Sequence, residues 1–346
     1  MKSREIQIDK RMIGDDFEPL VIAEIGINHD GDFSKAEQMI KDAYESGAEC
    51  VKFQCHVVDD EMIENDIIPA NADETIWNMM KRCSFSEQEE NSLKKYVEEF
   101  GMIYLSTPFG REAVNRLERM NVKAYKIGSG ECNNIPLLEI IASKRKPVLL
   151  STGMNDINSI QESVNVLEKY QVPYALIHTT SLYPTPYEKV RLGAITDIRK
   201  NFPNVVLGLS DHSLGNYTCF GAVSLGCSIL EKHFTSNKNW HGPDIEVSID
   251  PFELKELIQG SKAIHKALGG EKNFLTEEKI TSNFAFASVV SISNISPGES
   301  FSYENLWVKR PGTGEISAKE LKKIINKKAT KYISKDTQLE WNMIEN

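Results

Sequence analysis

Short apolar runs alternate with helix-like segments from residue 20 to about residue 268 of the 346-residue chain, and this alternation restricts its fold more than any other feature. The segments between the runs have the apolar spacing of amphipathic helices, for example FSKAEQMIKDAYESGA and INSIQESVNVLEKYQV. Eight βα units of this length have the size and order of a (β/α)8 barrel. The eight runs are LVIAEIGIN, CVKFQCH, MIYLSTPF, AYKIGSG, PVLLSTG, YALIHTT, VVLGLSDH and SILEKHF.

A doubly wound open sheet is the alternative fold for such an alternating chain. That fold usually has fewer strands and a glycine-rich phosphate loop after its first strand. No GxGxxG or GxxxxGK[ST] motif follows a strand-like run here. We therefore predict an α/β fold, a TIM barrel over residues 1–268, in which residues 1–19 are an N-terminal extension.

Three further segments depart from the repeat. Residues 57–85 form a long insertion after the second run, on the side where a barrel carries its active site. Residues 269–283 begin with Gly-Gly and are polar, which predicts a linker. Residues 284–346 contain short β-like runs broken by Pro-Gly and then the helix-like SAKELKKIINKKA. They predict a small β-rich domain that packs on a larger body.

Charge and composition argue against several kinds of partner. A net charge of −10 is unfavourable for binding nucleic acid or an anionic membrane. No apolar run is long enough to span a bilayer, and no secretory signal begins the sequence. The six cysteines form no CxxC pair, which indicates buried free thiols. We therefore predict a cytoplasmic protein with no nucleic-acid or membrane partner.

Polar residues gather at the C-terminal ends of the predicted strands, where a barrel places its catalytic groups. Capping of the following helices explains serines and threonines there, but it does not explain lysines, glutamates and histidines. Alternate residues of a barrel strand face the interior. Several of these polar residues have that spacing, namely Glu24 with Asn28, Lys52 with Gln54, Ser210 with His212, and Glu231 with His233.

Two kinds of chemistry follow from these residues. Lys52 and Lys126, together with nearby hydroxyl groups, predict a site for one phosphate group. His212 and His233 end neighbouring strands and are predicted to share a metal ion that keeps open positions for water and a substrate oxygen. Such an ion would polarise a carbonyl group. The hydroxyl groups are those of Thr107, Ser129, Ser151 and Ser210.

Longer motifs resemble a known family. IAEIGINHDGD, VKFQ, LSTPF, YKIGSGECNN, LSTGM, YPTP, GLSDH and EKHF resemble the sialic acid synthases, the bacterial NeuB family. FAFASVV and NLWVKRPGTG resemble the antifreeze-like SAF domain of the same enzymes, so the resemblance covers essentially the whole chain in order. GECNN, YPTPYEKVRLG and FAFASVV are most similar to the bacterial N-acetylneuraminate synthases. That resemblance implies condensation of phosphoenolpyruvate with N-acetylmannosamine and release of phosphate.

The resemblance also implies roles for single residues. His212 and His233 match the family's metal ligands, usually for Mn²⁺, and Glu24 matches the acidic residue near the metal and the reacting carbonyl. Arg310 matches an arginine that reaches the N-acetyl group from the partner subunit of a domain-swapped homodimer. Ser181 stands where close relatives often carry Asn, and its hydroxyl reaches less far. Phosphoenolpyruvate positions are matched by Lys52, Thr107, Lys126, Ser129, Ser151, Ser181 and Ser210, and sugar positions by Gln54, Glu131, Tyr183 and Asp244.

The implied reaction begins with attack of C3 of phosphoenolpyruvate on the open-chain sugar aldehyde, held in attack geometry. Water then captures C2, and phosphate leaves by C–O cleavage while Glu24 manages charge or a proton. The alternatives are a related legionaminic or pseudaminic acid synthase, another phosphoenolpyruvate-dependent keto-acid synthase, and a Schiff-base aldolase that uses Lys52 or Lys126. Ice binding by the tail is disfavoured by the charged VKRPGTGE segment and the intact barrel.

Overall fold

The computed structural model describes residues 4–69 and 73–345. The chain divides into two compact units, Met1–Gly269 and Gly270–Asn346, and each is described by itself. No helix in the described ranges combines the length and the apolar character needed to cross a bilayer.

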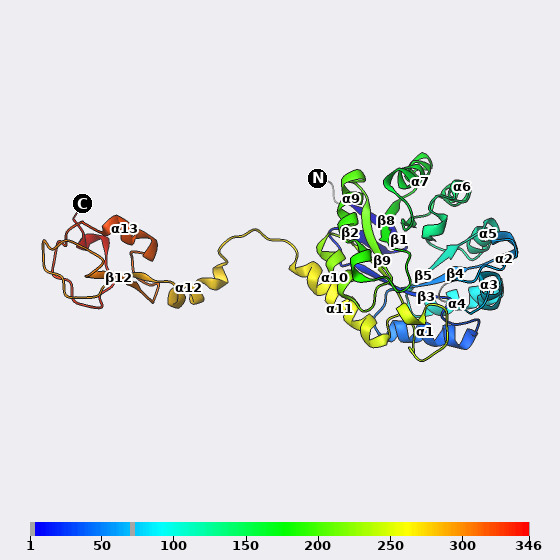
Figure 1. The fold of residues 1–346 in the computed structure, drawn as a ribbon, viewed down its shortest axis with the longest axis horizontal. Helices are drawn as coiled ribbons and strands as arrows, with labels where there is room; N and C mark the ends of the chain where they lie inside the picture. Colours follow the sequence, from blue (N-terminus) through cyan, green and yellow to red (C-terminus); the bar gives the residue numbers. More distant parts are fainter. Residues whose placement is uncertain (1–3, 70–72, 346) are drawn as a thin grey trace. The chain divides into compact units, whose positions relative to one another are not determined.

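The first unit is a barrel of eight parallel strands, which confirms the predicted fold (Figure 1). The hydrogen-bonded order is β5-β4-β3-β10-β9-β8-β7-β6. β5 and β6 lie side by side, although no ladder joins them in the described part of the chain, so the barrel is nearly closed. The strands are β3 Leu20–Gly26, β4 Cys50–Cys55, β5 Ile103–Pro108, β6 Tyr125–Ile127, β7 Val148–Ser151, β8 Tyr174–Thr179, β9 Val206–Asp211 and β10 Ile229–His233.

Amphipathic helices form the outer layer. In α1, Phe33–Glu45, the side chains of Ala36, Met39, Ile40 and Ala43 are buried at helical spacing, and Asp32 caps its first turn. The other long helices bury their apolar faces against the same strands. They are α4 Glu87–Glu99, α5 Arg111–Arg119, α6 Ile135–Ser143, α7 Ile157–Lys169, α9 Gly193–Asn201, α10 Tyr217–Ser224 and α11 Pro251–Ala267.

The N-terminal extension is a hairpin of β1, Glu5–Ile8, and β2, Arg11–Gly14. Its side chains Ile6, Ile8 and Ile13 are buried in one cluster with the apolar residues of the barrel interior, such as Leu20 and Ile229. These apolar interior residues lie toward the N-terminal ends of the strands. Polar interior residues are therefore confined to the C-terminal ends.

The long insertion after β4 carries structure of its own. It contains α2, Val58–Glu61, and α3, Ile76–Cys83. Val58 packs in a small apolar cluster with Met79, Met80 and Cys83. Such packing is expected of a long loop inside a compact domain.

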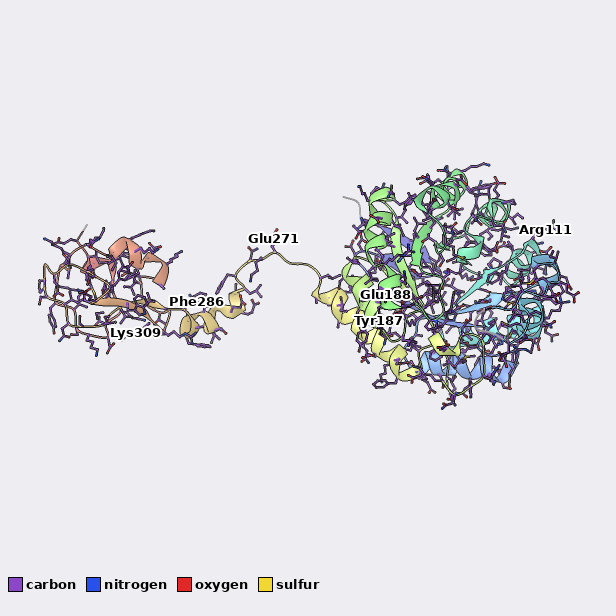
Figure 2. The ribbon with its side chains drawn as sticks, in the orientation of Figure 1. Arg111, Tyr187, Glu188, Glu271, Phe286 and Lys309 are labelled. Carbon is purple, nitrogen blue, oxygen red and sulfur yellow. The ribbon has the colours of Figure 1, made fainter. Side chains whose placement is uncertain are left out.

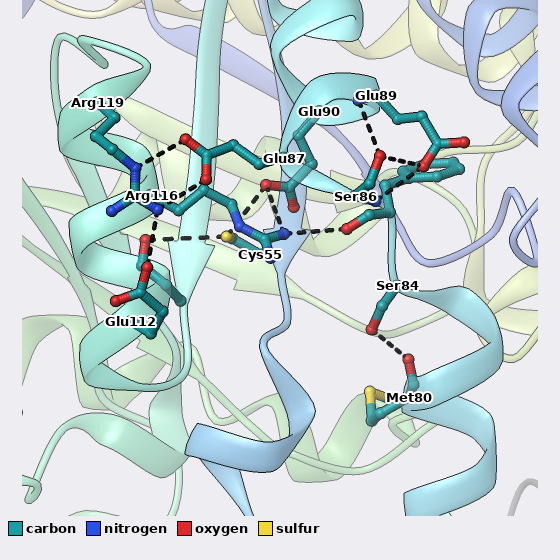
Figure 3. A network of polar contacts seen from close by, with 12 residues as sticks. Cys55, Met80, Ser84, Ser86, Glu87, Glu89, Glu90, Glu112, Arg116 and Arg119 are labelled. Carbon is teal, nitrogen blue, oxygen red and sulfur yellow. Dashed lines mark hydrogen bonds and ion pairs between the residues drawn. The ribbon is translucent and has the colours of Figure 1, made fainter.

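A buried polar network fixes the end of β4 against α4 and α5 (Figure 3). The Cys55 thiol donates to Glu90 Oε2 at 3.3 Å. Arg116 Nη1 lies 3.3 Å from the same oxygen and also donates to the Phe85 carbonyl at 3.0 Å. The network therefore connects the second strand, whose end carries candidate site residues, to two helices.

The second unit is small and β-rich, as predicted. Strand β11, Ser288–Ser291, pairs antiparallel with β12, Leu306–Lys309, around a separate apolar core. The helix predicted from SAKELKKIINKKA is shorter, because only η4, Ala318–Glu320, and α13, Leu321–Ile324, are helical. The helix ends because Ile325 already has a non-helical ψ of 135°; Asn326 follows with a φ of 73°, and the residues after it pair with other segments of the unit.

The segment that follows α11 is only partly irregular. It has no regular structure around Glu271 (Figure 2). It then forms η3, Thr276–Glu278, and α12, Lys279–Ala285. The polar sequence taken as a linker is thus helical in its second half.

Candidate active site

A cavity of about 320 Å³ lies at the C-terminal ends of the barrel strands. It is lined by every candidate site residue named above except Glu131, Asp244 and Arg310. A larger cavity of about 530 Å³ lies near the N-terminal ends of β4 and β5, beside Arg11 and Glu49. We assign the chemistry to the smaller cavity, because barrel enzymes place their reacting groups at the C-terminal face.

The interior side of each strand changes from apolar to polar along its length. On β3, Leu20 and Ile22 belong to the interior core, and Glu24 lines the cavity two residues later. On β10, Ile229 belongs to the core, and Glu231 and His233 line the cavity. The two-residue period of strands therefore brings polar groups from separate segments into one cavity.

The ammonium group of Lys52 is buried against a carboxylate. Its Nζ lies 2.7 Å from Glu24 Oε1 and donates to Thr107 Oγ1 at 3.4 Å. Burial raises the pKa of Glu24, although Lys52 opposes this shift. Burial acts to lower the pKa of Lys52, but the charges of Glu231 and Glu24 outweigh it and the pKa rises.

Lys126 is buried in a second pair. Its Nζ donates to Ser151 Oγ at 2.7 Å and lies 3.2 Å from Glu231 Oε1. Ser210 Oγ donates to the same Glu231 oxygen at 2.9 Å. Burial lowers the pKa of Lys126, whereas the two lysines and Ser210 outweigh the burial of Glu231 and lower the pKa of its carboxyl. Each cavity lysine therefore has a carboxylate partner within the chain.

Two hydroxyl groups lie so close to Gly153 that there is no room for a side chain at this position. The backbone N–H of Gly153 donates to Ser129 Oγ at 3.0 Å. A Cβ atom at Gly153 would lie 2.5 Å from Ser181 Oγ and 2.7 Å from Ser129 Oγ. Gly153 thus lets Ser129 and Ser181 approach each other on the side of the cavity that Ser151 also lines.

The two histidines face each other with their ring centroids 5.4 Å apart. His212 Nδ1 lies 3.0 Å from the Thr180 carbonyl, which leaves its Nε2 available to the cavity. His233 Nδ1 is buried without a hydrogen-bond partner among the described residues and lies 3.7 Å from Asp244 Oδ2. Burial lowers the pKa of His233 and lowers that of His212 to about 4, so both imidazoles are neutral at pH 7.

These two imidazoles fit a metal ion. Neutral ring nitrogens are good ligands, and an orphaned buried nitrogen such as His233 Nδ1 is costly unless something binds it. No group of three or more His, Cys, Asp or Glu side chains with the spacing of a metal site exists in the described ranges. An ion held here would therefore have only two protein nitrogens and would complete its coordination with water and substrate oxygens.

The remaining candidates lie apart from the cavity lining. The Glu131 carboxylate accepts from Asn134 Nδ2 at 2.6 Å, and burial raises its pKa. Asp244 lies beside His233, and burial, with the nearby Glu24, raises its pKa to about 7. Arg310 belongs to the second unit, follows β12 and is exposed.

Family models match both units. The NeuB family model matches residues 39–273, and the SAF domain model matches residues 286–345. The chain belongs to the NeuB family. As a member it is a phosphoenolpyruvate-dependent condensing enzyme, a nonulosonate synthase.

Relatives cover nearly all of this NeuB-family chain. It is 36% identical to an N,N'-diacetyllegionaminic acid synthase of Campylobacter jejuni, over 92% of this chain and 97% of that protein. It is 34% identical to the enzyme of the same name in Legionella pneumophila, over 94% of both chains. Its structure is similar to that of an N-acetylneuraminic acid synthetase from Leptospira borgpetersenii, with a TM-score of 0.74 and 32% identity over 81% of this chain and 95% of that one.

The cavity also contains residues that sequence reasoning did not assign to the site. Glu231 was recognised only as an interior neighbour of His233, although that spacing was the signal for its place between Lys126 and Ser210. Phe109 and Met154 also line the cavity, and no sequence signal marks them because they lie in loops beyond the strands.

Proposed function

We propose that this NeuB-family chain condenses phosphoenolpyruvate with N-acetylmannosamine to give N-acetylneuraminate and phosphate. The observation that carries the proposal is the composition of one buried cavity. Two ammonium groups, several hydroxyl groups and two neutral histidines line it together. The first set suits an anion, and the second suits a metal ion and a carbonyl oxygen.

In this proposal, Lys52 and Lys126 hold the phosphate and carboxylate groups of phosphoenolpyruvate, with hydroxyl groups as further donors. Those of Ser151 and Thr107 already contact the lysines. In the free chain the ammonium charges are balanced by Glu24 and Glu231. The substrate therefore competes with two carboxylates for the lysines, which favours a multiply charged anion over a neutral ligand.

His212 and His233 would hold a divalent ion, with Mn²⁺ our first expectation, and a bound ion would make an aldehyde carbonyl more electrophilic. Tyr183 packs against His212, Asp244 lies beside His233, and Gln54 lines the same cavity; these three side chains would orient the amino sugar. Glu24 lies between Lys52 and Gln54, where it can manage charge or a proton as the aldehyde reacts.

The reaction balances without another reactant. C3 of phosphoenolpyruvate forms a bond to the aldehyde carbon, and the aldehyde oxygen takes up a proton. Water adds to C2 and loses a proton, and the bond between C2 and the phosphate oxygen then breaks. The products are a 2-keto acid and inorganic phosphate. The lysines keep the two anionic ends in position for the attack.

A legionaminic acid precursor is the second candidate acceptor. Two relatives that cover more than nine-tenths of this chain bear the name N,N'-diacetyllegionaminic acid synthase. Such an acceptor carries a second acetamido group, which N-acetylmannosamine lacks. Comparing the two sugars therefore decides between the candidates.

The second unit has a proposed role in the same site. Arg310 is exposed, and its guanidinium fork is suited to an amide oxygen. We infer a domain-swapped homodimer in which Arg310 reaches the N-acetyl group bound in the partner's barrel. All six cysteines are buried and free, which suits the reducing cytoplasm in which we place the activity.

The test measures phosphate release from phosphoenolpyruvate with a panel of amino sugars, with and without Mn²⁺. We expect turnover with N-acetylmannosamine and ¹⁸O-labelled phosphate when the bridging oxygen of phosphoenolpyruvate carries the label. Faster turnover with the diacetamido sugar would instead identify the legionaminic acid precursor as the acceptor. Unlabelled phosphate, or a borohydride-trapped adduct at Lys52 or Lys126, would refute the mechanism.

A further inference from the structure

His56 is a buried histidine outside the cavity lining, and both of its ring nitrogens are engaged. Its Nδ1 lies 2.7 Å from Glu61 Oε2. Its Nε2 lies 3.0 Å from Gln54 Oε1. Its side chain is 3% exposed and that of Glu61 is 9% exposed, so water replaces neither contact easily.

Both partners of His56 are hydrogen-bond acceptors. A neutral imidazole has a single N–H and can satisfy only one of them. Both contacts are satisfied together when the ring donates from both nitrogens, one to the Glu61 carboxylate and one to the Gln54 oxygen. The ring stacks on Phe109 with a centroid distance of 4.5 Å and an interplanar angle of 11°, which fixes its plane.

This donor determines which way the Gln54 amide points. Because Gln54 Oε1 accepts from His56, its NH2 group faces Glu24 and donates to Oε1 at 3.3 Å. Glu24 Oε1 also receives the Lys52 ammonium, so it is an acceptor and opposes the reversed amide. One amide hydrogen of Gln54 remains for the cavity, so Gln54 can offer an N–H donor there while its oxygen points to His56.

The first helix of the insertion supplies the counterion. Glu61 is the last residue of α2, which is also fixed from the other side because the Glu112 backbone N–H donates to Asp60 at 2.7 Å. Asp59, on the same helix, instead points to solvent and pairs with Lys81 at 2.9 Å. The insertion thus delivers one specific carboxylate to His56.

We propose that His56 and Glu61 are positioning residues that fix the Gln54 amide, so that the sugar site presents an N–H donor to an acceptor oxygen of the substrate. This inference rests on the proposed function, because it assigns the Gln54 amide to the amino sugar. Without His56 the buried Gln54 oxygen loses its donor, and the amide is held only by the 3.3 Å contact of its NH2 group with Glu24.

Three variants and one control test this. His56→Leu removes the donor, and His56→Gln restores an N–H at about the reach of Nε2. Glu61→Gln removes the counterion, so that the neutral ring can donate to Gln54 and accept from the new amide. Asp59→Asn is the matched control, because it removes a charge from the same helix without touching His56.

We expect His56→Leu to raise the KM for the amino sugar roughly tenfold to a hundredfold, the cost of an unmet buried hydrogen bond. The KM for phosphoenolpyruvate should change less than about threefold, and His56→Gln should recover most of the loss. Equal KM values in His56→Leu and His56→Gln would overturn the proposal, as would a parallel rise in both KM values. If His56→Leu does not fold, the same comparison is made between His56→Gln and Gln54→Leu, and unchanged sugar affinity in Gln54→Leu overturns it.

A second measurement is independent of turnover. ¹⁵N spectra of the imidazole groups should show both His56 nitrogens protonated in the wild type and only one in Glu61→Gln, with His56→Gln identifying the signals. A singly protonated His56 in the wild type would refute the positioning role. If no amino sugar is turned over while this spectrum is as expected, the proposed function fails and the His56 assignment stands.

Discussion

Replacing Lys126 by Met tests whether its ammonium group binds the anionic substrate or only stabilises the fold. The structure places that ammonium group in a buried polar network. Its Nζ contacts Ser151 Oγ at 2.7 Å and Glu231 Oε1 at 3.2 Å, and both members of the pair are at most 6% exposed. Removing one partner leaves Glu231 with Ser210 alone, and one Glu231 oxygen already lacks a partner. Breaking a buried pair in this way costs about 3–5 kcal/mol.

The double variant Lys126→Met/Glu231→Gln removes both charges. We expect it to recover most of that free energy of unfolding, because no unpaired charge stays buried. It should not recover affinity for phosphoenolpyruvate. One hydrogen bond to a charged group contributes about 1.5–3 kcal/mol, which corresponds to an affinity loss of about 10-fold to 150-fold.

The assays are urea unfolding for stability, and titration of phosphoenolpyruvate in the absence of sugar for affinity. Glu231→Gln alone keeps the Lys126 side chain and removes a competing carboxylate, so it should bind phosphoenolpyruvate at least as tightly as the wild type. A stable double variant with wild-type affinity for phosphoenolpyruvate would refute the assignment of Lys126 to the anion. The assignment would also be refuted if the double variant lost as much affinity for the sugar as for phosphoenolpyruvate.

Three further outcomes are expected. His212→Ala/His233→Ala should lose Mn²⁺ binding by calorimetry, and EDTA should stop wild-type turnover; a double variant that keeps its turnover in EDTA contradicts the metal role. The six buried thiols should react with Ellman's reagent only after unfolding, because burial raises the pKa of thiols such as Cys50 and Cys219. A verified heterodimer of His233→Ala and Arg310→Ala chains should regain about half of wild-type activity, and an inactive one excludes the swap.

Strand periodicity predicts which side of the barrel a residue faces. Glu24, Lys52, Ser210 and His233 were each placed at a strand end on the interior side, and each lines the cavity. This succeeds because alternation depends only on local backbone geometry. The shorter helix near Asn326 was missed because a pattern of apolar residues does not show where neighbouring segments pair with the chain.

Contacts across the barrel could not be predicted in the same way. Lys52 and Glu24 lie opposite each other on adjacent strands, so that pair follows from register. Lys126 lies on β6 and Glu231 on β10, and these strands are not neighbours. Their contact depends on the diameter of the closed barrel and the tilt of its strands, which no short stretch of sequence encodes.

The same distinction explains why the two lysines looked available for substrate in the sequence and are paired in the structure. A buried ammonium group without a counterion is too costly to persist, so the empty site must supply its own anions. Glu24 and Glu231 do this at 2.7 Å and 3.2 Å. In the proposed function, substrate binding then exchanges these carboxylate contacts for contacts with the phosphate and carboxylate groups of phosphoenolpyruvate. On that proposal the affinity for phosphoenolpyruvate depends on the difference between two sets of buried ion pairs, and we expect removal of the competing Glu231 carboxylate to increase it.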